Sequence, residues 1–411
     1  MNPGPAGMRI SPEKLSDRRR DRSGRILLTG GTGFLGSHLA AALLREGYEV
    51  ILLARSSKGA AAEERMDRLF DWLGLSTGDR EKLRVVDAEI VRRRLGLDDR
   101  EYERLAGAVD EIVHCASNTS FSSRKKGEVE AANIGGLGNI LDLAASSGCA
   151  SFHLVSTAYV AGKNEGLCRE TLVRPAAFHN AYEETKCAAE WLARERCREE
   201  GIRLSIYRPS IVCGDSRTGR SFLFNAVYYP VRTALFLKDL FEKDIREKGG
   251  RKAGPMGIRL EEDGAVHLPI RIEVREGAGI NVIPVDHFVK AFLVIMAGAP
   301  DGGIFHIVNR RIKPIEDIVE YAKRMFRLRG IEVCRAEAFK EKARNGLEVL
   351  FDTYLEAYGP YMRDARVFTT DASGPFLEKH ALVSPEFDYE LFSKCMSYAV
   401  ESGWSALLFP I

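Results

Sequence analysis

Short apolar runs alternate with longer amphipathic segments through the first half of the chain. Six runs rich in Ile, Leu and Val predict β-strands near residues 26–29, 49–53, 83–86, 111–115, 151–155 and 203–207. Between them, apolar positions at helical spacing predict helices near 34–46, 60–73, 126–147 and 181–200, each ended by a glycine: Gly47, Gly74, Gly148 and Gly201. This alternation predicts the α/β class, with a Rossmann-type doubly wound parallel sheet.

The composition changes after Gly214. Helical patterns recur at 286–299 and 315–327, and short strands are predicted around 304–308 and 331–335. Such material usually covers the carboxyl ends of the strands, where ligands bind. We therefore divide the chain into an arm (1–24), a doubly wound domain (25–214) and a smaller mixed substrate-binding region (215–411) that is interleaved with that domain.

Two segments of the second half are distinctive. The longest apolar tract, Phe222–Leu237, contains Asn225, Pro230 and Arg232, so it is too short and too interrupted to cross a bilayer. We interpret it as a packed helix, with a lining for a lipophilic substrate or a shallow membrane contact as the alternatives. Residues 239–264 are charged and glycine-rich, which predicts a mobile surface loop or lid.

Composition limits the function further. A chain of 411 residues with 45% hydrophobic and 29% charged residues is typical of a globular protein with more than one region. The net charge of +2 argues against nucleic acid as the main partner. The eight cysteines include no C-x-x-C pair, so we expect neither a metal site nor a disulfide framework and predict a reducing, cytoplasmic location.

The first residues differ from a targeting sequence. They lack the apolar core of a signal peptide. Arg18, Arg19, Arg20 and Arg22 stand among Pro, Gly, Ser and Asp in residues 1–24, which predicts a disordered basic arm. A membrane-binding or partner-binding tail is the alternative.

A glycine-rich turn follows the first predicted strand. Gly30, Gly33 and Gly36 stand at three-residue spacing between that strand and an amphipathic helix. In a dinucleotide-binding turn the first glycine permits the tight turn, the second lets the backbone approach the pyrophosphate, and the third lets the helix pack on the strand. The helix N-terminus then supplies free N–H groups for an anion. The context of strand, turn and helix favours this interpretation over an ordinary turn.

Two further residues bear on the cofactor. Arg55 ends the second strand about 25 residues after the first glycine of the turn, where an NAD-preferring site commonly has an acidic residue. Its guanidinium can pair with a 2′-phosphate, so NADP(H) is favoured over NAD, with a plain surface arginine as the alternative. His114 closes the fourth strand, and we interpret it as a core histidine rather than a catalytic one.

Tyr182 and Lys186 lie four residues apart at the start of a predicted helix. Such residues share one helix face, so the phenol and the ammonium converge. A nearby cation lowers the pKa of a phenol from about 10 toward neutrality, which makes the group a proton donor and acceptor. A chance surface pair is the alternative. Ser156 and Thr157 follow the fifth strand, at the edge that would face the cofactor, where a hydroxyl can hydrogen-bond a substrate oxygen.

Together these residues resemble the extended short-chain dehydrogenase/reductases, and within them the thioester reductase and fatty acyl-CoA reductase branch. The resemblance covers about residues 25–400. The segments that carry it are LLTGGTGFLGSHL, LGLDDREYERLAGAVDEIVHCAS, LVSTAYVAG, AYEETK, YRPSIVCGDSRTG, GINVIPVDHFVKAF and GIFHIVNRR. One departure is Ala88-Glu89, where the family has an adenine-contacting Gly-Asp.

The resemblance implies roles for individual residues. Thr157 would be the catalytic hydroxyl, Tyr182 the general acid, and Lys186 the residue that holds the nicotinamide ribose. Asn133 matches an active-site asparagine, and Arg208 belongs to a segment that lines the nicotinamide end. The predicted cofactor contacts are Gly30, Thr32, Gly33, Phe34, Leu35, Gly36, Arg55, Glu89, Ile90, Cys115, Ala116, Ser117, Lys186, Pro209, Ser210 and Ile211.

The implied reaction is reduction of an acyl thioester, on coenzyme A or a carrier, to aldehyde or alcohol by hydride transfer from NADPH. The apolar tract at 222–237 and the charged segment at 239–264 would then form an acyl groove and its cover. A 3β-hydroxysteroid dehydrogenase or a nucleotide-sugar epimerase or dehydratase is the alternative enzyme, and Arg55 argues against the epimerase. A non-catalytic NADP-binding regulatory protein is the alternative of another class. The sequence leaves open whether the protein forms a homodimer.

Overall fold

The computed structural model describes residues 24–57 and 59–404, so the predicted arm lies outside them apart from Gly24. Its centre is a sheet of seven parallel strands in the order β13-β7-β5-β4-β1-β2-β3. The strands are β1 (Arg25–Thr29), β2 (Glu49–Ala54), β3 (Leu83–Asp87), β4 (Glu111–His114), β5 (Ser151–Val155), β7 (Arg203–Pro209) and β13 (Gly303–Ile307). The predicted α/β class and parallel sheet are confirmed.

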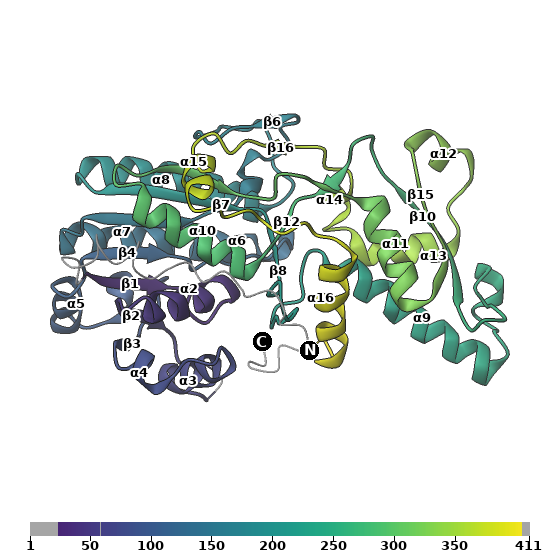
Figure 1. Cartoon of the computed structure of the whole chain (residues 1–411), viewed down its shortest axis with the longest axis horizontal. Helices are drawn as coiled ribbons and strands as arrows, with labels where there is room; N and C mark the ends of the chain where they lie inside the picture. The colour runs from purple at the N-terminus through teal and green to yellow at the C-terminus, as the bar shows by residue number, and fades with distance from the viewer. Residues whose placement is uncertain (1–23, 58, 405–411) are drawn as a thin grey trace, which may run out of the picture.

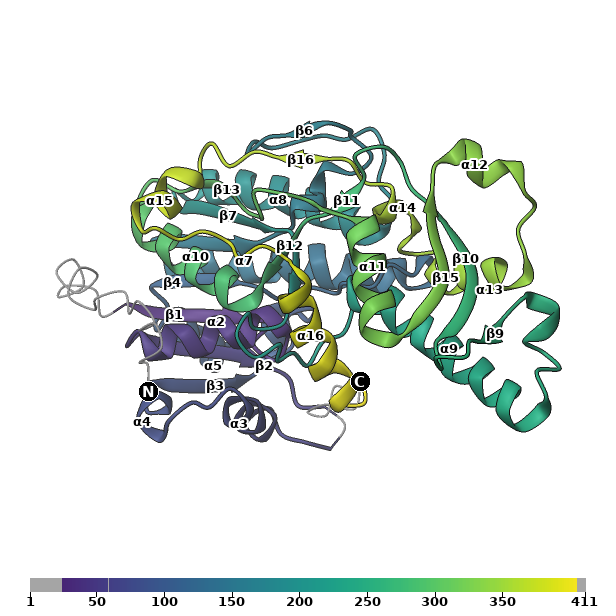
Figure 2. The same cartoon turned by 45° about the vertical axis from the view of Figure 1, so that its right-hand side comes forward.

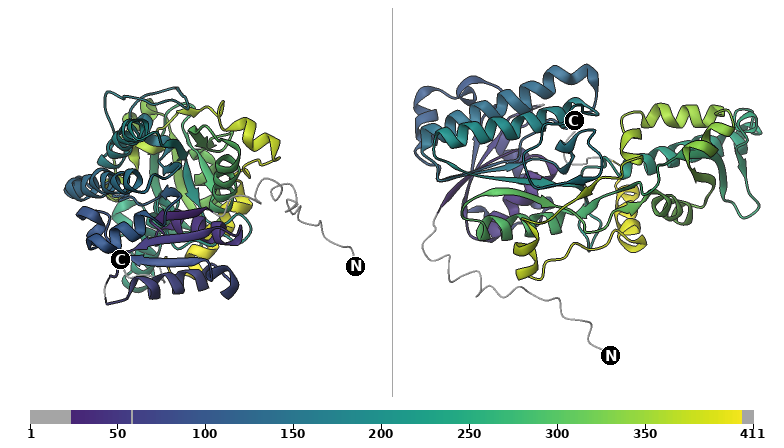
Figure 3. Two further views of the ribbon diagram at one scale, coloured as in Figure 1. Left: turned by 90° about the vertical axis from the view of Figure 1, so that its left-hand side faces the viewer. Right: turned by 90° about the horizontal axis from the view of Figure 1, so that it is seen from above.

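Helices cover both faces of this sheet (Figure 3). One layer contains α2 (Phe34–Arg45), α3 (Ala62–Trp72) and α10 (Val285–Gly298); the other contains α5 (Asp99–Ala106), α7 (Gly136–Ser147) and α8 (Ala181–Glu199). Side chains of β1 alternate between the layers, because neighbouring residues of a strand point to opposite faces. Ile26 and Leu28 join the core under α2, and Leu27 joins the core under α7.

Most of the helices and strands begin and end within a few residues of the predicted positions. The glycines expected to end helices do so with φ of 86° at Gly47, 67° at Gly74, 61° at Gly148 and 67° at Gly201. The helix expected over 126–147 is divided: α6 (Lys126–Glu130) passes through a π-turn (Ala131–Gly135) into α7. Such turns are frequent at functional sites, and this one carries Asn133.

The C-terminal half builds a second, smaller body beside the sheet, at the right of Figures 1 and 2. Its own sheet contains β10 (Val266–Glu273), flanked by β15 (Leu328–Cys334) and β9 (Arg259–Leu260). Around it lie α9 (Tyr228–Lys248), α11 (Ile315–Phe326), α12 (Ala336–Glu341), α13 (Gly346–Leu355) and α16 (Tyr389–Glu401). The strict alternation of buried and half-buried residues along β10 gives this body its core.

The prediction of a loop or lid over residues 239–264 is wrong for residues 239–248, whereas residues 249–264 consist of turns, a short 3-10 helix (Gly254–Met256) and β9. Residues 228–248 form the helix α9, whose Leu237 and Phe241 are buried. The charges lie on its outer side, where Glu242 pairs with Lys238 at 3.5 Å and with Arg246 at 2.8 Å. These one-turn ion pairs explain why a charged stretch is helical rather than a loop.

Two short parallel pairs join the two halves of the chain: β6 (Leu167–Cys168) with β16 (Val367–Phe368), and β8 (Ile211–Cys213) with β12 (Val282–Pro284). The other short elements are the antiparallel pair of β11 (Gly279–Ile280) with β14 (Lys313–Pro314), and the helices α4 (Thr77–Arg80), α14 (Gly359–Met362) and α15 (Gly374–Lys379). Within 24–57 and 59–404, no helix has the length and apolar character needed to span a bilayer.

Candidate active site

The glycine turn lies against the loop that follows β4. Gly30 has φ of 75°, and a Cβ there would stand 2.6 Å from the Ala116 nitrogen. A Cβ on Gly36 would stand 2.2 Å from the Gly30 carbonyl oxygen. Both glycines are therefore required by close backbone approach, in agreement with their expected conformational roles. Gly33 precedes α2 and is exposed, so the first N–H groups of this helix face open space where an anion can bind.

The end of β2 presents two arginines. Arg55 is exposed, and Arg65 of α3 donates Nη1 to the Arg55 carbonyl at 2.5 Å. Burial and the nearby Arg55 charge lower the pKa of Arg65. The sequence prediction missed Arg65, because nothing along the chain distinguishes it from other arginines of its helix. The two guanidiniums fit a phosphate group beside this strand end.

Residues 88–90 lie at the same edge of the sheet. The Ala88 N–H donates to the Ala54 carbonyl at 2.9 Å, and the Glu89 N–H donates to Leu95 at 2.9 Å. The Ile90 carbonyl accepts the Asn139 amide at 2.7 Å. Glu89 and Ile90 are thus held beside the end of β2, although Ala88-Glu89 stands where the family has an adenine-contacting Gly-Asp.

The end of β4 is buried and chemically inert. His114 Nδ1 lies 3.0 Å from Thr29 Oγ1, and burial lowers the pKa of His114 to about 3. The same hydroxyl accepts the Ala116 N–H at 3.1 Å. His114 is therefore the core histidine that we predicted. Burial also raises the pKa of the Cys115 thiol to about 12.

Asn133 makes hydrogen bonds with every polar group of its side chain. Its Oδ1 accepts Ser117 Oγ at 3.0 Å and the Asn118 N–H at 2.7 Å. Its Nδ2 donates to the Asn118 carbonyl at 3.1 Å and to Thr185 Oγ1 at 3.0 Å. Since both donors and both acceptor positions are used, Asn133 fixes the loop after β4 against α8 rather than offering a free group to a substrate.

The structure brings Thr157, Tyr182 and Lys186 together. Thr157 follows β5; its hydroxyl accepts the Tyr159 N–H at 3.3 Å and lies close enough to the Tyr182 phenol to lower the pKa of that phenol. Tyr182 is the second residue of α8, and Lys186 lies one turn further along. The Lys186 ammonium is buried and donates to the Val155 carbonyl at 2.7 Å. Thr157 and the Lys186 ammonium therefore both lie at the end of β5, and Tyr182 stands one turn before Lys186 on α8.

The expected effect of Lys186 on the Tyr182 pKa is absent. Desolvation raises the pKa of Tyr182, and the nearby Thr157 hydroxyl offsets only part of that rise. Burial lowers the pKa of Lys186 to about 8. The physical reason is that both groups lie in a poorly solvated pocket, and the ammonium is directed at the Val155 carbonyl.

The residues at the carboxyl end of β7 and just after it divide into two groups. Arg208 is buried in an ion pair with Glu190 at 2.5 Å, so it does not line the nicotinamide end as expected. Pro209, Ser210 and Ile211 follow it at the carboxyl edge. The buried hydroxyls of Ser156 and Ser210 have no hydrogen-bond partner within the described part of the chain. Such unpaired groups fit contact with a polar ligand in this place.

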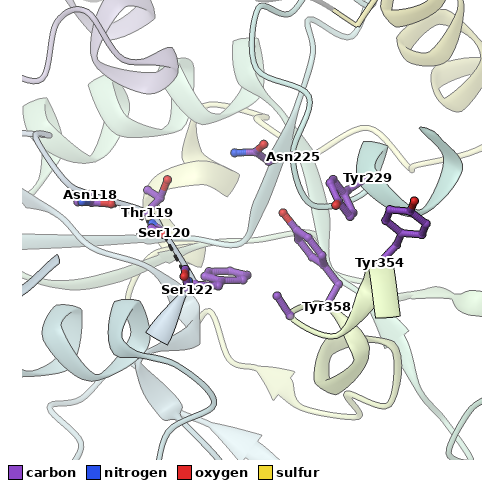
Figure 4. A pocket seen from close by; sticks show the side chains of 10 residues that line it. Asn118, Thr119, Ser120, Ser122, Asn225, Tyr229, Tyr354 and Tyr358 are labelled. Carbon is purple, nitrogen blue, oxygen red and sulfur yellow. Dashed lines mark hydrogen bonds between the residues drawn. The ribbon is translucent and has the colours of Figure 1, made fainter. Parts of the chain in front are cut away.

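Two cavities of about 430 Å³ each share Phe121, which contacts the Tyr182 ring. The first is drawn in Figure 4, where Tyr229, Tyr354 and Tyr358 face the loop after β4. Its lining consists of Asn118, Thr119, Ser120, Phe121, Ser122, Asn225, Tyr229, Tyr354, Ala357 and Tyr358. The apolar tract contributes Asn225 and Tyr229, whereas residues 239–264 contribute nothing to this lining.

The second cavity has two charged residues, Lys126 and Glu184, in its lining. It is lined by Phe121, Ser123, Lys126, Ala176, Ala177, Phe178, His179, Asn180, Ala181 and Glu184. Phe121 lines both cavities, and its ring centroid lies 6.0 Å from that of Tyr182 and 5.7 Å from that of Tyr358. The two cavities therefore extend from the same ring, next to Tyr182.

Comparison with known proteins gives relatives among large synthases. Over 272 residues the chain is 32% identical to "Isonitrile lipopeptide synthase" from Streptomyces coeruleorubidus; the match covers 59% of this chain and 18% of the synthase. Among solved structures, the terminal R domain of the myxalamid PKS-NRPS biosynthetic pathway superimposes with a TM-score of 0.72, at 23% identity over 93% of this chain and 91% of that chain. A thiolation-reductase di-domain from an archaeal non-ribosomal peptide synthetase gives a TM-score of 0.68 at 16% identity, over 93% of this chain and 76% of that chain. The chain thus spans less than a fifth of the synthase it matches.

The fold and the site together define an NAD(P)-dependent oxidoreductase of the extended short-chain dehydrogenase/reductase class. Residues 28–292, more than half of the chain, match the family described as Male sterility protein. The chain belongs to this family. Its residues fit a dinucleotide, because the glycine turn, the first turn of α2 and the unpaired serines meet at one edge of the sheet.

Proposed function

We propose that this chain is an NADPH-dependent reductase of acyl thioesters, carried by a phosphopantetheine arm or by coenzyme A. The observation that carries the proposal is the pair of cavities that share the Phe121 ring, whose centroid lies 6.0 Å from that of Tyr182. A thioester carbonyl has an acyl chain on one side and a thiol arm on the other, and such a substrate fits two cavities. The synthase and R-domain relatives support the same substrate class.

Thr157 and Tyr182 would act on the carbonyl oxygen. Their hydroxyls lie close to one another, so an oxygen placed between them could accept from both. When bound, the dinucleotide supplies a hydride to the carbonyl carbon. Tyr182 would give its proton to the oxygen, and the resulting hemithioacetal would lose the thiol and leave an aldehyde. One hydride and one proton are consumed for each thioester reduced, and a second round would give the alcohol.

The remaining residues would hold the cofactor. Gly30, Thr32, Gly33, Phe34, Leu35 and Gly36 would contact the pyrophosphate, Arg55 and Arg65 the 2′-phosphate, Glu89 and Ile90 the adenine, and Cys115, Ala116, Ser117, Pro209, Ser210 and Ile211 the nicotinamide half. Lys186 would hold the nicotinamide ribose, and its buried ammonium favours a hydroxyl partner. Asn133 would act as a positioning residue, since its own hydrogen bonds fix the loop that lines the first cavity.

The test is NADPH oxidation with acyl-CoA, acyl-carrier and N-acetylcysteamine thioesters, beside steroid and nucleotide-sugar substrates. We expect turnover with thioesters, and a loss of about 10²–10⁴-fold in kcat for Tyr182→Phe, because a positioned proton donor contributes that much. Tyr389→Phe on α16 is the matched control. Turnover confined to a steroid or a nucleotide sugar would refute the proposed function, and full activity of Tyr182→Phe would refute the assigned acid.

A further inference from the structure

Tyr182 lies in the first turn of α8, and the first and last turns are the parts of a helix with the fewest backbone hydrogen bonds. It is the second residue of the helix, where N–H groups have no partner in the preceding turn. A proton donor, however, has to be held within about 0.5 Å of its productive position. The neighbouring side chain, Glu183, is completely buried, which is rare for a carboxylate without a partner.

Glu183 is bound from two sides. Its Oε1 accepts the Tyr361 hydroxyl at 2.7 Å, and its Oε2 accepts the His179 N–H at 3.0 Å. The Tyr361 hydroxyl in turn accepts the amide of Asn180, the N-cap of α8, at 2.8 Å. Asn180 also accepts the Glu183 N–H at 3.0 Å. Glu183, Tyr361 and Asn180 thus form a closed ring of hydrogen bonds around the first turn of α8.

Tyr361 comes from α14, 178 residues further along the chain. Its ring lies between Phe121, at 5.5 Å, and Tyr159, at 5.3 Å. Arg366 anchors the same segment by donating to the Gly162 carbonyl at 2.6 Å. Because α14 also follows Tyr358, which lines the first cavity, the segment that borders the cavity also contacts the turn that carries Tyr182.

We propose that the Glu183–Tyr361 hydrogen bond is a clasp that positions the Tyr182 phenol for proton transfer. Tyr361 and Glu183 are positioning residues, since neither contacts the reacting atoms. The kinetic part of this proposal rests on the proposed function, in which Tyr182 is the acid. The structural part, that the clasp orders residues 179–188, is independent of any substrate.

Tyr361→Phe tests the clasp, because it removes one hydroxyl and keeps the ring. We expect amide hydrogen exchange of residues 179–188 to become at least about tenfold faster, with no change over 190–200, since opening of one turn is a local event. Tyr389→Phe on α16 is the matched control and should change neither region. Unchanged exchange at 179–188, or equal acceleration throughout the chain, would overturn the proposal.

A kinetic cycle completes the test. We expect Tyr361→Phe to lower kcat about five- to twentyfold with KM within twofold, since misplacement by a fraction of an ångström affects the transition state more than binding. Glu183→Gln, which keeps an acceptor for Tyr361, should retain more activity than Glu183→Ala, and adding Tyr361→Phe to Glu183→Ala should cost nothing more. If the losses of activity caused by Glu183→Ala and Tyr361→Phe add up in the double variant, the clasp is contradicted. If the unmodified protein reduces an aldehyde but no thioester, the proposed function is refuted. The effect of Tyr361→Phe and of the Glu183 variants can then still be measured with the aldehyde as substrate.

Discussion

The ammonium of Lys186 donates a 2.7 Å hydrogen bond to the carbonyl of Val155, the last residue of β5. This bond crosses from α8 to the main sheet and fixes the ammonium next to Thr157. The Lys186 side chain is 4% exposed, and burial lowers its pKa to about 8. A charged group with that pKa changes its protonation close to physiological pH.

The first prediction concerns the pH dependence of reduction. Lys186 is charged below its pKa and neutral above it, so a role that needs the ammonium is present at low pH and lost as pH rises. We expect kcat/KM to be level below about pH 7 and to fall tenfold per pH unit above about 8. The Tyr182 phenol keeps its proton across this range, because desolvation raises its pKa. Initial rates from pH 6 to 10 provide the measurement.

Lys186→Arg is the control for that assignment. A guanidinium stays charged throughout the range, so the fall near pH 8 should disappear even if the rate is lower. The same fall in Lys186→Arg would mean that another group titrates there.

The second prediction concerns the choice of cofactor. Arg55 and Arg65 lie together at the end of β2, where a 2′-phosphate would meet both charges. We expect Arg55→Ser to raise KM for NADPH by about 10–100-fold and to leave KM for NADH within about threefold, since charge-assisted bonds contribute 1.5–3 kcal/mol each. Arg65→Ser should act in the same direction. The comparison of KM values for the two cofactors measures this.

Arg68→Ser serves as the matched control, because Arg68 stands on the same helix and pairs with Glu64. If both variants at positions 55 and 65 lose NADPH and NADH equally, these arginines do not discriminate between the cofactors.

The sequence predicted the parts of the fold that depend on local pattern. Apolar runs located all seven strands of the main sheet, and the glycines marked the ends of helices. The charged half of α9 was misjudged, because charge alone does not distinguish an exposed helix face from a loop. The i,i+4 pairs of Glu242 with Lys238 and Arg246 were present in the sequence and could have shown the difference.

The site was predictable in part for a similar reason. Tyr182 and Lys186 stand four residues apart on one helix, so their spacing alone predicts that they share a helix face. Tyr361 and Arg65 reach the site through tertiary structure, and no local pattern connects them with Glu183 or Arg55. The pKa of Tyr182 depends on desolvation by residues from several elements, which a pair of residues cannot reveal.

The third prediction concerns the acyl chain. Tyr229 of α9 stacks on Tyr358 with ring centroids 4.9 Å apart, and both line the first cavity. We expect Tyr229→Ala to raise KM for an octanoyl thioester about tenfold or more and to leave KM for an acetyl thioester unchanged, because removal of a buried apolar contact costs about 1.5–3 kcal/mol. Leu240→Ala, at an exposed position of the same helix, is the control. Equal effects on the two thioesters would place the acyl chain elsewhere.

The last prediction concerns stability rather than chemistry. Glu190 of α8 and Arg208 of β7 are each 1% exposed and form a bidentate pair, with bonds of 2.8 Å and 2.5 Å. Arg208 also donates to the carbonyls of Arg169 and Thr171, so its charge is fully surrounded by acceptors. Removal of the carboxylate alone would leave a buried guanidinium without a counter-charge.

We expect Glu190→Ala to lower the free energy of unfolding by about 3–5 kcal/mol, the usual cost of an uncompensated buried charge. Replacing both partners, in Glu190→Leu with Arg208→Met, should recover much of this loss because no charge then remains buried. Urea unfolding followed by tryptophan fluorescence measures the difference, and Glu195→Ala at an exposed site of the same helix is the control. A double variant less stable than Glu190→Ala would mean that Arg208 stabilises the fold mainly through its backbone acceptors, independently of the ion pair.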